Sequence, residues 1–395
     1  MAESGHLVHG LRGESVNPDW PSVDLVCVRD LISALSHVSV ANTEDFVPVG
    51  QKEDVSILWR SPRPMSAAAV VKAGNKKLFV KRHHSSVRSV SDIRCEHAFI
   101  GYLHNHAIKV PHVYSDENGE TAFVRGEYIY EVSDALTGED LYKDRMSWSY
   151  YFFPKHAYNA GKALANLHLA SERFSGTAKD FGPLCNSAEV IVSGDPLAKL
   201  QAIIGERPVL AGSILQATTS LGSFFERFSR VHLPFIEKLA GRDSAIKSGY
   251  THGDWHPSNM SWTDGGEEAE VDCIFDFGLS NLTFLQHDIA LALERSCIDW
   301  LGISGTGWDR AGLIAFLRGY DSVKELSPED LRLVADVLPV CHLEYALSEA
   351  EYFGGVLNRT DNVVLAYETY LFGHSEFFRS PEGTELQETV ANFKR

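Results

Sequence analysis

The sequence predicts an α+β fold with two unequal lobes, in which strands dominate the first third of the chain and helices the remainder. Runs of apolar residues between turn-formers predict strands at residues 76–82 and 122–132. Apolar residues at helical spacing recur at residues 156–168, 289–301 and 340–353. The chain has 395 residues, of which 44% are hydrophobic, so it can bury more than one core.

The N-terminal elements are expected in the following order. Residues 1–20 combine Gly, Ser, Asn, Pro and charged residues with little periodicity, and we expect a flexible extension. Residues 24–38 have a helical apolar pattern and are expected to pack on the smaller lobe. A strand at residues 76–82 follows a Gly-Asn turn, and residues 93–103 read as the next helix.

The boundary between the lobes is expected just after a pair of strands. Residues 122–125 and 128–132 read as this pair, and residues 133–138 change to turn-forming types. We therefore predict a smaller lobe over residues 21–132 and a larger lobe over residues 133–395.

The larger lobe is expected to be mainly helical. Residues 156–168 have the apolar spacing of a buried helix, and His168 at its end is interpreted as a packed, hydrogen-bonded core residue. Asp288 precedes the apolar helix at residues 289–301, which predicts that it is the N-cap of that helix.

Composition excludes several classes of partner. The formal charge of −17 argues against nucleic acid or an anionic membrane, because both require a basic surface. The six cysteines include no Cys-x-x-Cys pair, so neither a zinc site nor a disulfide framework is indicated. We find no leader-like start and no apolar run of membrane length, and we expect a cytoplasmic protein with reduced thiols.

Two segments near residue 260 carry the residues of a phosphoryl-transfer site. The first reads His-Gly-Asp-Trp-His-Pro-Ser-Asn over residues 252–259, and the second reads Val-Asp-Cys-Ile-Phe-Asp-Phe-Gly over residues 271–278. Asp254 can orient an acceptor hydroxyl and take its proton. Asn259 and Asp276 offer the oxygen ligands that Mg²⁺ prefers. This order of residues predicts transfer of a phosphoryl group.

A purely structural interpretation of the same region is a β-hairpin. Residues 260–262 and 271–275 flank the turn sequence Thr-Asp-Gly-Gly. The two interpretations are compatible, since such a hairpin carries the proposed metal ligands at its two ends.

The HGDWHPSN and IFDFG segments resemble the catalytic and metal-binding motifs of the aminoglycoside phosphotransferase and choline kinase family, whose fold is similar to that of protein kinases. A protein kinase has Arg before the catalytic Asp and Lys two positions after it, whereas this chain has Gly253 and His256. The small-molecule branch is therefore the better match.

The resemblance implies a protein-kinase-like bilobal fold, with an antiparallel sheet and a helix in the small lobe and a larger, mainly helical lobe. It also implies a Mg²⁺-dependent kinase with Asp254 as catalytic base. Such an enzyme moves the γ-phosphate of ATP, or alternatively GTP, to a hydroxyl of a small metabolite or antibiotic. An acceptor that carries an amine group is compatible with this resemblance.

Further roles follow from the resemblance. Lys81 on its strand is expected to hold the nucleotide phosphates, braced by an ion pair with Glu96 on the next helix. Glu131 and Val132 are expected near the adenine edge, where main-chain groups of the hinge bind the base.

The chain departs from the family in the turn that covers the phosphates. Kinase-like folds use glycines there, but residues 59–70 contain none. Ser61, Arg63 and Ser66 are the candidate replacements as hydrogen-bond donors, and a surface turn with a solvated arginine is the equally weighted alternative.

Acceptor contacts are expected from the C-terminal helices. Glu344 lies on an amphipathic segment, and Glu294 lies on the helix after Asp-Phe-Gly. Both carboxylates suit an amine-bearing acceptor, although carboxylates on a helix often form only a solvated face.

Two other classes of function stay open at this point. The His252-x-Asp254-x-His256 spacing is compatible with a metal-dependent hydrolase, although no further ligands cluster nearby in the sequence. The glycine-free turn is compatible with a catalytically inactive kinase fold that binds or regulates a partner.

Overall fold

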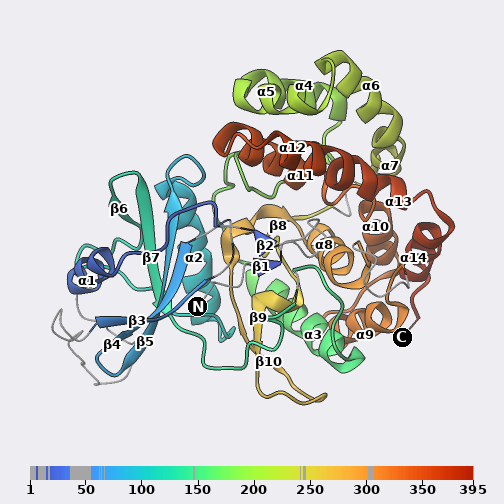
Figure 1. Ribbon diagram of the computed structural model, residues 1–395. Coiled ribbons are helices and arrows are strands. Elements are labelled where there is room, and N and C mark those ends of the chain that lie inside the picture. The colour runs from blue at the N-terminus through green and yellow to red at the C-terminus, as the bar shows by residue number, and fades with distance from the viewer. Residues whose placement is uncertain are drawn as a thin grey trace.

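The computed structural model has two lobes, as predicted (Figure 1). It describes residues 6–7, 15–16, 18–35, 55–61, 63, 65, 67–145, 147–240, 242, 246–300 and 307–394. The smaller lobe is built on one antiparallel sheet, and helices make up most of the larger lobe. The predicted α+β, bilobal fold class is therefore confirmed.

The sheet of the smaller lobe has the strand order β3-β4-β5-β7-β6, and every neighbouring pair is antiparallel. Its strands are β3 (Val55–Arg60), β4 (Ala67–Ala73), β5 (Lys76–His84), β6 (Phe123–Arg125) and β7 (Tyr128–Asp134). The predicted strands at residues 76–82, 122–125 and 128–132 are confirmed. Because β7 continues to residue 134, the sheet extends two residues beyond the expected lobe boundary.

Two helices accompany this sheet. Helix α1 (Leu25–Ala34) packs on one face, where its Val28 and Ile32 share a buried cluster with Leu78 and Val80 of β5. Helix α2 (Val90–Asn105) begins with a capping box, since Ser89 and Asp92 each bond to the other's backbone N–H. It lies between the sheet and the larger lobe (Figure 1).

The alternation of side chains along β5 determines where its lysine points. Leu78 and Val80 face α1, so Lys81 lies on the opposite face of the sheet. Glu131 on β7 is directly opposite Lys81 in the register and shares this face. The sheet therefore presents an ammonium and a carboxylate toward α2 and the larger lobe.

The larger lobe contains most of the helices, together with short strands around the site. Its helices are α3 (Pro154–Ser171), α4 (Pro196–Glu206), α5 (Pro208–Ala217), α6 (Leu221–Val231), α7 (Leu233–Ile236), α8 (Leu285–Cys297), α9 (Arg310–Asp321), α10 (Pro328–Val337), α11 (Leu343–Glu351), α12 (Thr360–Leu365), α13 (His374–Phe377) and α14 (Pro381–Ala391). The π-helical turns η5 (Tyr352–Val356) and η6 (Ala366–Gly373) extend α11 and α12.

Two antiparallel strand pairs carry the sequence motifs. Strands β8 (Ser248–Thr251) and β11 (Asn281–Phe284) pair with each other, and β9 (Met260–Trp262) pairs with β10 (Val271–Ile274). The predicted hairpin is thus confirmed. The first motif lies between β8 and β9, and the second consists of β10 and the four residues after it.

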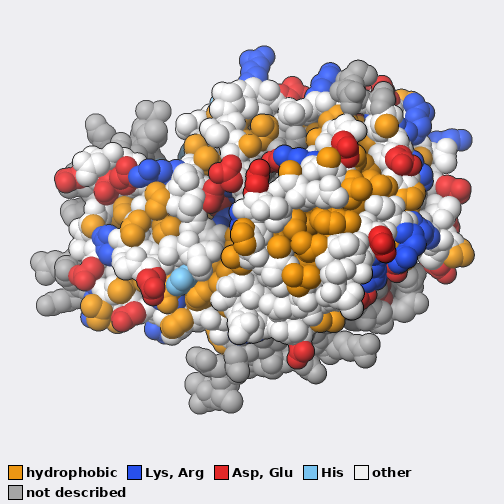
Figure 2. Space-filling view, turned by 90° about the horizontal axis from the view of Figure 1, so that it is seen from above, with side chains coloured by type: hydrophobic (Ala, Val, Ile, Leu, Met, Phe, Trp, Pro, Cys, Tyr) orange, Lys and Arg blue, Asp and Glu red, His pale blue; other side chains and the backbone are white. Residues whose placement is uncertain are grey.

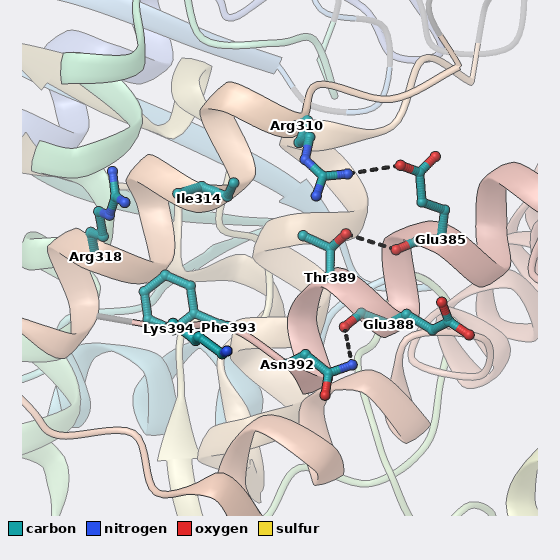
Figure 3. Close-up of a pocket in the computed structure, with 9 residues that line it drawn as sticks. All are labelled: Arg310, Ile314, Arg318, Glu385, Glu388, Thr389, Asn392, Phe393 and Lys394. Carbon is teal, nitrogen blue, oxygen red and sulfur yellow. Dashed lines mark hydrogen bonds and ion pairs between the residues drawn. The ribbon is translucent and has the colours of Figure 1, made fainter.

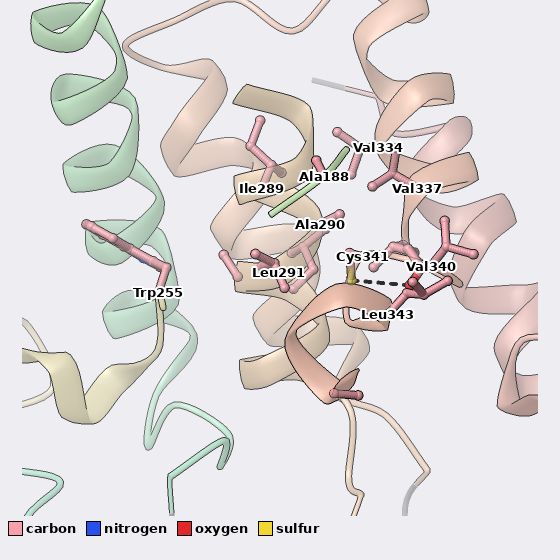
Figure 4. Packing of buried hydrophobic residues seen from close by; sticks show 14 of the residues in the cluster. Ala188, Trp255, Ile289, Ala290, Leu291, Val334, Val337, Val340, Cys341 and Leu343 are labelled. Carbon is pink, nitrogen blue, oxygen red and sulfur yellow. Dashed lines mark hydrogen bonds between the residues drawn. The ribbon is translucent and has the colours of Figure 1, made fainter. Parts of the chain in front are cut away.

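Side chains of these strands belong to the large hydrophobic core of this lobe. Figure 4 shows Ile289, Ala290 and Leu291 of α8 packed beside Val334 and Val337 of α10. All five side chains are buried. Since close-packed interiors resist displacement, α8 is a firm base for any site residue that it carries.

The end of the N-terminal segment is anchored to both lobes. Asp19 accepts a hydrogen bond from the Tyr352 hydroxyl at 2.9 Å, and the Trp20 indole donates to the same hydroxyl at 3.2 Å. Trp20 also stacks on His84 of β5, with ring centroids 4.6 Å apart. These contacts differ from the flexible extension expected for residues 1–20. The same segment also contains a strand pair, β1 (His6–Leu7) with β2 (Ser15–Val16).

The surface of the larger lobe carries an apolar area on the face seen in Figure 2. Exposed apolar side chains of the larger lobe include Val209 and Leu215 on α5 and Val364 on α12. None of the helices described here combines the length with the apolar character that a membrane span requires.

Candidate active site

The backbone of the first motif is held in place by a buried carboxylate. Asp288 accepts hydrogen bonds from the backbone N–H of His252 at 2.9 Å and of Gly253 at 2.8 Å. His168 Nε2 lies 3.0 Å from the same carboxylate, and its Nδ1 lies 2.8 Å from the Tyr320 hydroxyl. The structural interpretation of His168 is confirmed, and Asp288 braces the loop.

The predicted N-cap role of Asp288 is wrong. Helix α8 begins at Leu285 and its N-cap is Phe284, so Asp288 lies within the first turn. The reason is that strand β11 runs directly into the helix, which lets the Asp288 carboxylate reach the loop before Asp254 rather than its own helix end.

Gly253 is required by the tight course of this loop. Its φ of +76° lies in the left-handed region, and a Cβ atom there would clash with the carbonyl oxygen of Leu279.

We expect Gly253→Ala to lower the free energy of unfolding by about 2–4 kcal/mol, because strain and overpacking add. Urea denaturation checks this, with Gly101→Ala in helix α2 as the control. Gly101 has open space around it, so alanine should stabilise by up to about 1 kcal/mol. Equal stability of Gly253→Ala and wild type would contradict the account of the loop.

The carboxylate of Asp254 is held by three side chains. Asn259 Nδ2 donates to Oδ2 at 2.9 Å, Arg295 Nη1 donates to Oδ1, and His256 Nε2 lies 3.5 Å from Oδ1. Burial alone would raise the pKa of Asp254, but the charge of Arg295 together with His256 and His252 outweighs burial and holds the pKa below its usual range. Asp254 is therefore an ionised carboxylate in a fixed orientation, and one-fifth of its side chain is exposed.

Arg295 is a site residue that the sequence interpretation missed. It is fully buried on α8, and its guanidinium also donates to the Gly253 carbonyl at 2.9 Å. The rings of Trp148 and Tyr345 lie 5.0 and 5.2 Å from its guanidinium carbon. The available signal was an arginine that closely follows the apolar run of residues 289–293 on the same helix, since a buried charge requires a partner.

Removal of the Arg295 charge should change the pH dependence of kcat/KM. In Arg295→Gln the pKa of Asp254 rises, so the acidic limb of kcat/KM against pH should move to higher pH. The loss of one partner of a buried pair should also cost about 3–5 kcal/mol of stability. A pH profile together with urea denaturation measures both. Arg310→Gln, which breaks an exposed ion pair with Glu385, is the control and should change neither. An unshifted acidic limb in Arg295→Gln would contradict the coupling.

Asp276 and Lys81 bring the two lobes together at the site. Lys81 Nζ lies 2.8 Å from Asp276 Oδ1. Burial would lower the pKa of Lys81, but Asp276 and Glu131 outweigh it and raise that pKa. For Asp276, burial acts to raise the pKa and the lysine lowers it, so the pair is charged. The charge of Asp254 also acts on Asp276, which places the two carboxylates near each other.

The expected ion pair between Lys81 and Glu96 is not formed. Glu96 lies on α2 as predicted, but its carboxylate bonds to Arg88 at 2.8 Å and to Lys179 at 2.9 Å. Both of these cations also donate to the Gly278 carbonyl, at 2.6 and 3.0 Å. Glu96 therefore anchors the Asp-Phe-Gly segment, because two buried cations reach it while Lys81 is engaged by Asp276.

The glycine-free turn lies between β3 and β4. The Ser61 hydroxyl accepts a hydrogen bond from the Arg63 backbone N–H at 3.2 Å, so it supports the turn itself. The charge of Arg63 helps to lower the pKa of Asp276, which places its guanidinium in the neighbourhood of that carboxylate. Ser66 lies outside the described residues.

Glu131 and Val132, which are expected near the adenine edge, both lie on strand β7. Glu131 accepts from His83 Nε2 at 2.8 Å and from His97 Nε2 at 2.7 Å. Val132 is fully buried, and its carbonyl accepts a hydrogen bond from Tyr114 N at 2.9 Å. The adenine contact of these two residues stays a prediction.

The residues expected to hold Mg²⁺ have suitable free oxygens. Asn259 is buried, its Nδ2 is used by Asp254, and its Oδ1 has no hydrogen-bond partner among the described residues. An unpaired buried amide oxygen is costly unless a ligand fills its place. Asp276 supplies a nearby carboxylate that is one-third exposed. Together they fit the oxygen donors that Mg²⁺ selects.

The two carboxylates expected to contact the acceptor have other partners. Glu344 Oε1 accepts a hydrogen bond from Val190 N at 3.0 Å, and burial raises its pKa to about 7. Glu294 Oε1 lies 2.8 Å from His374 Nδ1. A third one, Glu349, lies near enough to Asp254 and Arg295 for their charges to affect its pKa.

The spacing that suggested a metal hydrolase does not form a metal site. His252 Nε2 bonds to the Phe275 carbonyl at 3.1 Å, and His256 Nδ1 lies 3.0 Å from the Ser258 hydroxyl. In the described part of the chain, the ligand atoms of another group, Glu294, His342 and His374, come close enough to share a metal. Neither His252 nor His256 belongs to that group.

A surface hollow of about 410 Å³ lies elsewhere, between α9 and α14 (Figure 3). Its lining includes the exposed ion pair of Arg310 with Glu385, and none of the site residues above belongs to it. We assign it no part in the chemistry.

Comparison with known proteins agrees with the geometry. The model of the phosphotransferase enzyme family matches residues 66–326, more than half of the chain. The chain belongs to this family. The match covers Lys81 and both motifs of the site. No protein of the curated set matches the sequence.

Solved structures share the fold at low sequence identity. A microcompartment-associated aminopropanol kinase is 14% identical with a TM-score of 0.59, and the alignment covers 94% of this chain and all of that one. The amicoumacin kinase hAmiN, solved with AMP-PNP and Ca²⁺, is 16% identical with a TM-score of 0.53 over 90% and 97% of the two chains. An ethanolamine kinase of Plasmodium vivax is 14% identical with a TM-score of 0.52 over 84% of each. The chain thus has the fold of small-molecule kinases.

Proposed function

We propose that this phosphotransferase moves the γ-phosphoryl group of ATP, with GTP as an alternative donor, to a hydroxyl of a small molecule. The observation that carries the proposal is the Asp254 carboxylate, fixed by Asn259 and Arg295 beside the Lys81–Asp276 pair. These are the parts that phosphoryl transfer requires: an oriented base, oxygen ligands and a cation for phosphate.

Each residue has a distinct part in the proposed reaction. Asp254 orients the acceptor hydroxyl and accepts its proton as the oxygen attacks phosphorus. Lys81 and Arg63 bind phosphate oxygens, and Asn259 with Asp276 would hold Mg²⁺. The bound metal supplies positive charge that offsets the phosphates. Arg295 keeps the Asp254 carboxylate ionised and in position.

We further propose that the acceptor carries an amine, and that Glu349 is its partner. Burial raises the pKa of Glu349 to about 8, and Tyr345 and Arg295 lie close enough to act on its carboxylate. The aromatic rings of Trp148 and Tyr345 both lie beside the Arg295 guanidinium. Carboxylates and aromatic rings together favour an ammonium group. Similar structures described as aminopropanol and ethanolamine kinases agree with this class at the level of the fold alone.

This proposal predicts a pH effect on acceptor binding. The Glu349 carboxylate must lose its proton to pair with an ammonium, so KM for an amine acceptor should fall as the pH rises toward 8. Glu349→Gln should raise KM by about 10-fold or more and remove this pH dependence. Initial rates across pH measure it, with the exposed Glu206→Gln as control. A KM of Glu349→Gln that equals that of the wild type would contradict the contact.

A thermal-shift titration tests the proposed function before the acceptor is known. ATP and GTP are added with and without Mg²⁺, and then amino alcohols, aminoglycosides and sugars are added in turn. Stabilisation by nucleotide that requires Mg²⁺ is expected, because a ligand of the native state raises its apparent stability. No shift with either nucleotide would favour an inactive kinase fold instead.

A further inference from the structure

Three buried side chains from separate segments converge in the larger lobe, outside the proposed Mg²⁺ site. They are Glu294 on α8, His342 just before α11, and His374 at the start of α13. One ligand atom of each lies within 4.8 Å of the others. Glu294 Oε1 is 2.8 Å from His374 Nδ1, and Oε2 is 3.8 Å from His342 Nδ1. All three residues are at most 3% exposed.

Glu294 is the buried carboxylate of this cluster. Its close partners among the described residues include the two imidazoles themselves, with His374 Nδ1 2.8 Å from Oε1 and His342 Nδ1 3.8 Å from Oε2. A carboxylate taken out of water is costly unless it is well paired or binds a metal. The nearest other cation, Arg295, has its Nε 4.0 Å from Oε2 and donates instead to Asp254.

We propose that Glu294, His342 and His374 bind a transition-metal dication, with Zn²⁺ as the best fit. Two imidazole nitrogens and one carboxylate oxygen are a ligand set that Zn²⁺ uses when a further position is left for water or a substrate group. Mg²⁺ prefers an all-oxygen set such as that of Asn259 and Asp276, so the two sites select different metals.

The surroundings fit a metal centre with oriented ligands. The Trp300 ring stacks on the His374 imidazole at 3.6 Å with an interplanar angle of 8°. Trp148 meets the His342 ring edge-on at 4.8 Å. Glu349 Oε2 lies 4.0 Å from His342 Nε2, on the far side of the ring from the nitrogen that faces Glu294. Such outer partners fix the orientation of ligating imidazoles.

The position of this site links it to the catalytic loop. Glu294 is adjacent along α8 to Arg295, which holds Asp254. A metal here would join α8 to the residue before α11 and to the start of α13, which the ion pair of Glu294 with His374 already connects to α8. Removal of the metal should therefore loosen these helices without affecting nucleotide binding.

The test uses the full chain purified without a histidine tag and freed of metal by dialysis against a chelator. Calorimetric titration should show about one equivalent of Zn²⁺, and Co²⁺ should give the visible absorption of a low-coordinate protein site. His374→Gln and Glu294→Gln should each weaken Zn²⁺ binding by more than about 100-fold. Excess Mg²⁺ should not displace the Zn²⁺.

Two control variants separate this site from other sources of binding. Exposed His104→Gln should bind Zn²⁺ like the wild type, and Asp276→Asn should lose the Mg²⁺ response but keep wild-type Zn²⁺ binding. If His374→Gln does not fold, His342→Gln and the Co²⁺ spectrum of the wild type still decide the matter. Absence of stoichiometric Zn²⁺ binding in the wild type, or undiminished binding in folded His374→Gln, would overturn the proposal.

Discussion

Asp254→Asn should lower kcat by about 10²–10⁴-fold while the affinity for nucleotide stays within a few fold of the wild type. The reason is that the carboxylate acts on the acceptor hydroxyl, whereas phosphate binding is assigned to Lys81 and Arg63. Asparagine keeps an oxygen in place for Arg295. Steady-state kinetics and nucleotide titration measure the two effects separately.

Loss of stability could imitate this result, and a double variant separates the two. In Asp254→Asn the buried charge of Arg295 loses its counter-charge, which is destabilising. Adding Arg295→Gln removes that charge and should recover part of the stability but none of the turnover. The exposed Asp361→Asn is the matched control. Near-normal turnover of Asp254→Asn would contradict its role as base.

Asp276→Asn should abolish the dependence of nucleotide affinity on Mg²⁺ and weaken ATP binding at saturating Mg²⁺ by about 10-fold or more, equivalent to about 1.4 kcal/mol. Asparagine is the right replacement because Asp276 has a φ of +59°, and asparagine tolerates this left-handed conformation better than alanine does. The substitution also removes the charge that pairs with Lys81, which frees the lysine for phosphate.

The measurement is a titration of ATP at several Mg²⁺ concentrations. Asp272→Asn, on the same hairpin and partly exposed, is the control and should keep the wild-type response to Mg²⁺. If Asp276→Asn retained that response as well, the metal would have to be held elsewhere.

The parts of the site that are close together in the sequence were predictable. Asp254, Asn259 and Asp276 lie on one loop and one hairpin, so their spacing and turn signals determine how they come together. Alternation along β5 likewise predicts which face carries Lys81. Local geometry leaves few alternatives in both cases.

The partners that come from distant segments were not predictable. Arg295 reaches Asp254 from 41 residues away, and Lys179 reaches Glu96 from 83 residues away. The helix that carries Glu96 was predicted correctly. The predicted partner of Glu96, Lys81, was wrong, because Arg88 and Lys179 bind the same buried carboxylate. Pairing of charges across a core depends on tertiary packing, which a periodic pattern does not encode.

The most direct test of the central claim is transfer of label from γ-³²P-ATP to a panel of small hydroxyl compounds, with and without Mg²⁺. We predict a labelled small-molecule product that requires Mg²⁺, forms with the wild-type chain, and is absent with Asp254→Asn. A labelled product that forms equally well with Asp254→Asn would contradict the assigned chemistry. So would the absence of any transfer by a chain that binds Mg²⁺ and ATP across an acceptor panel that includes amino alcohols.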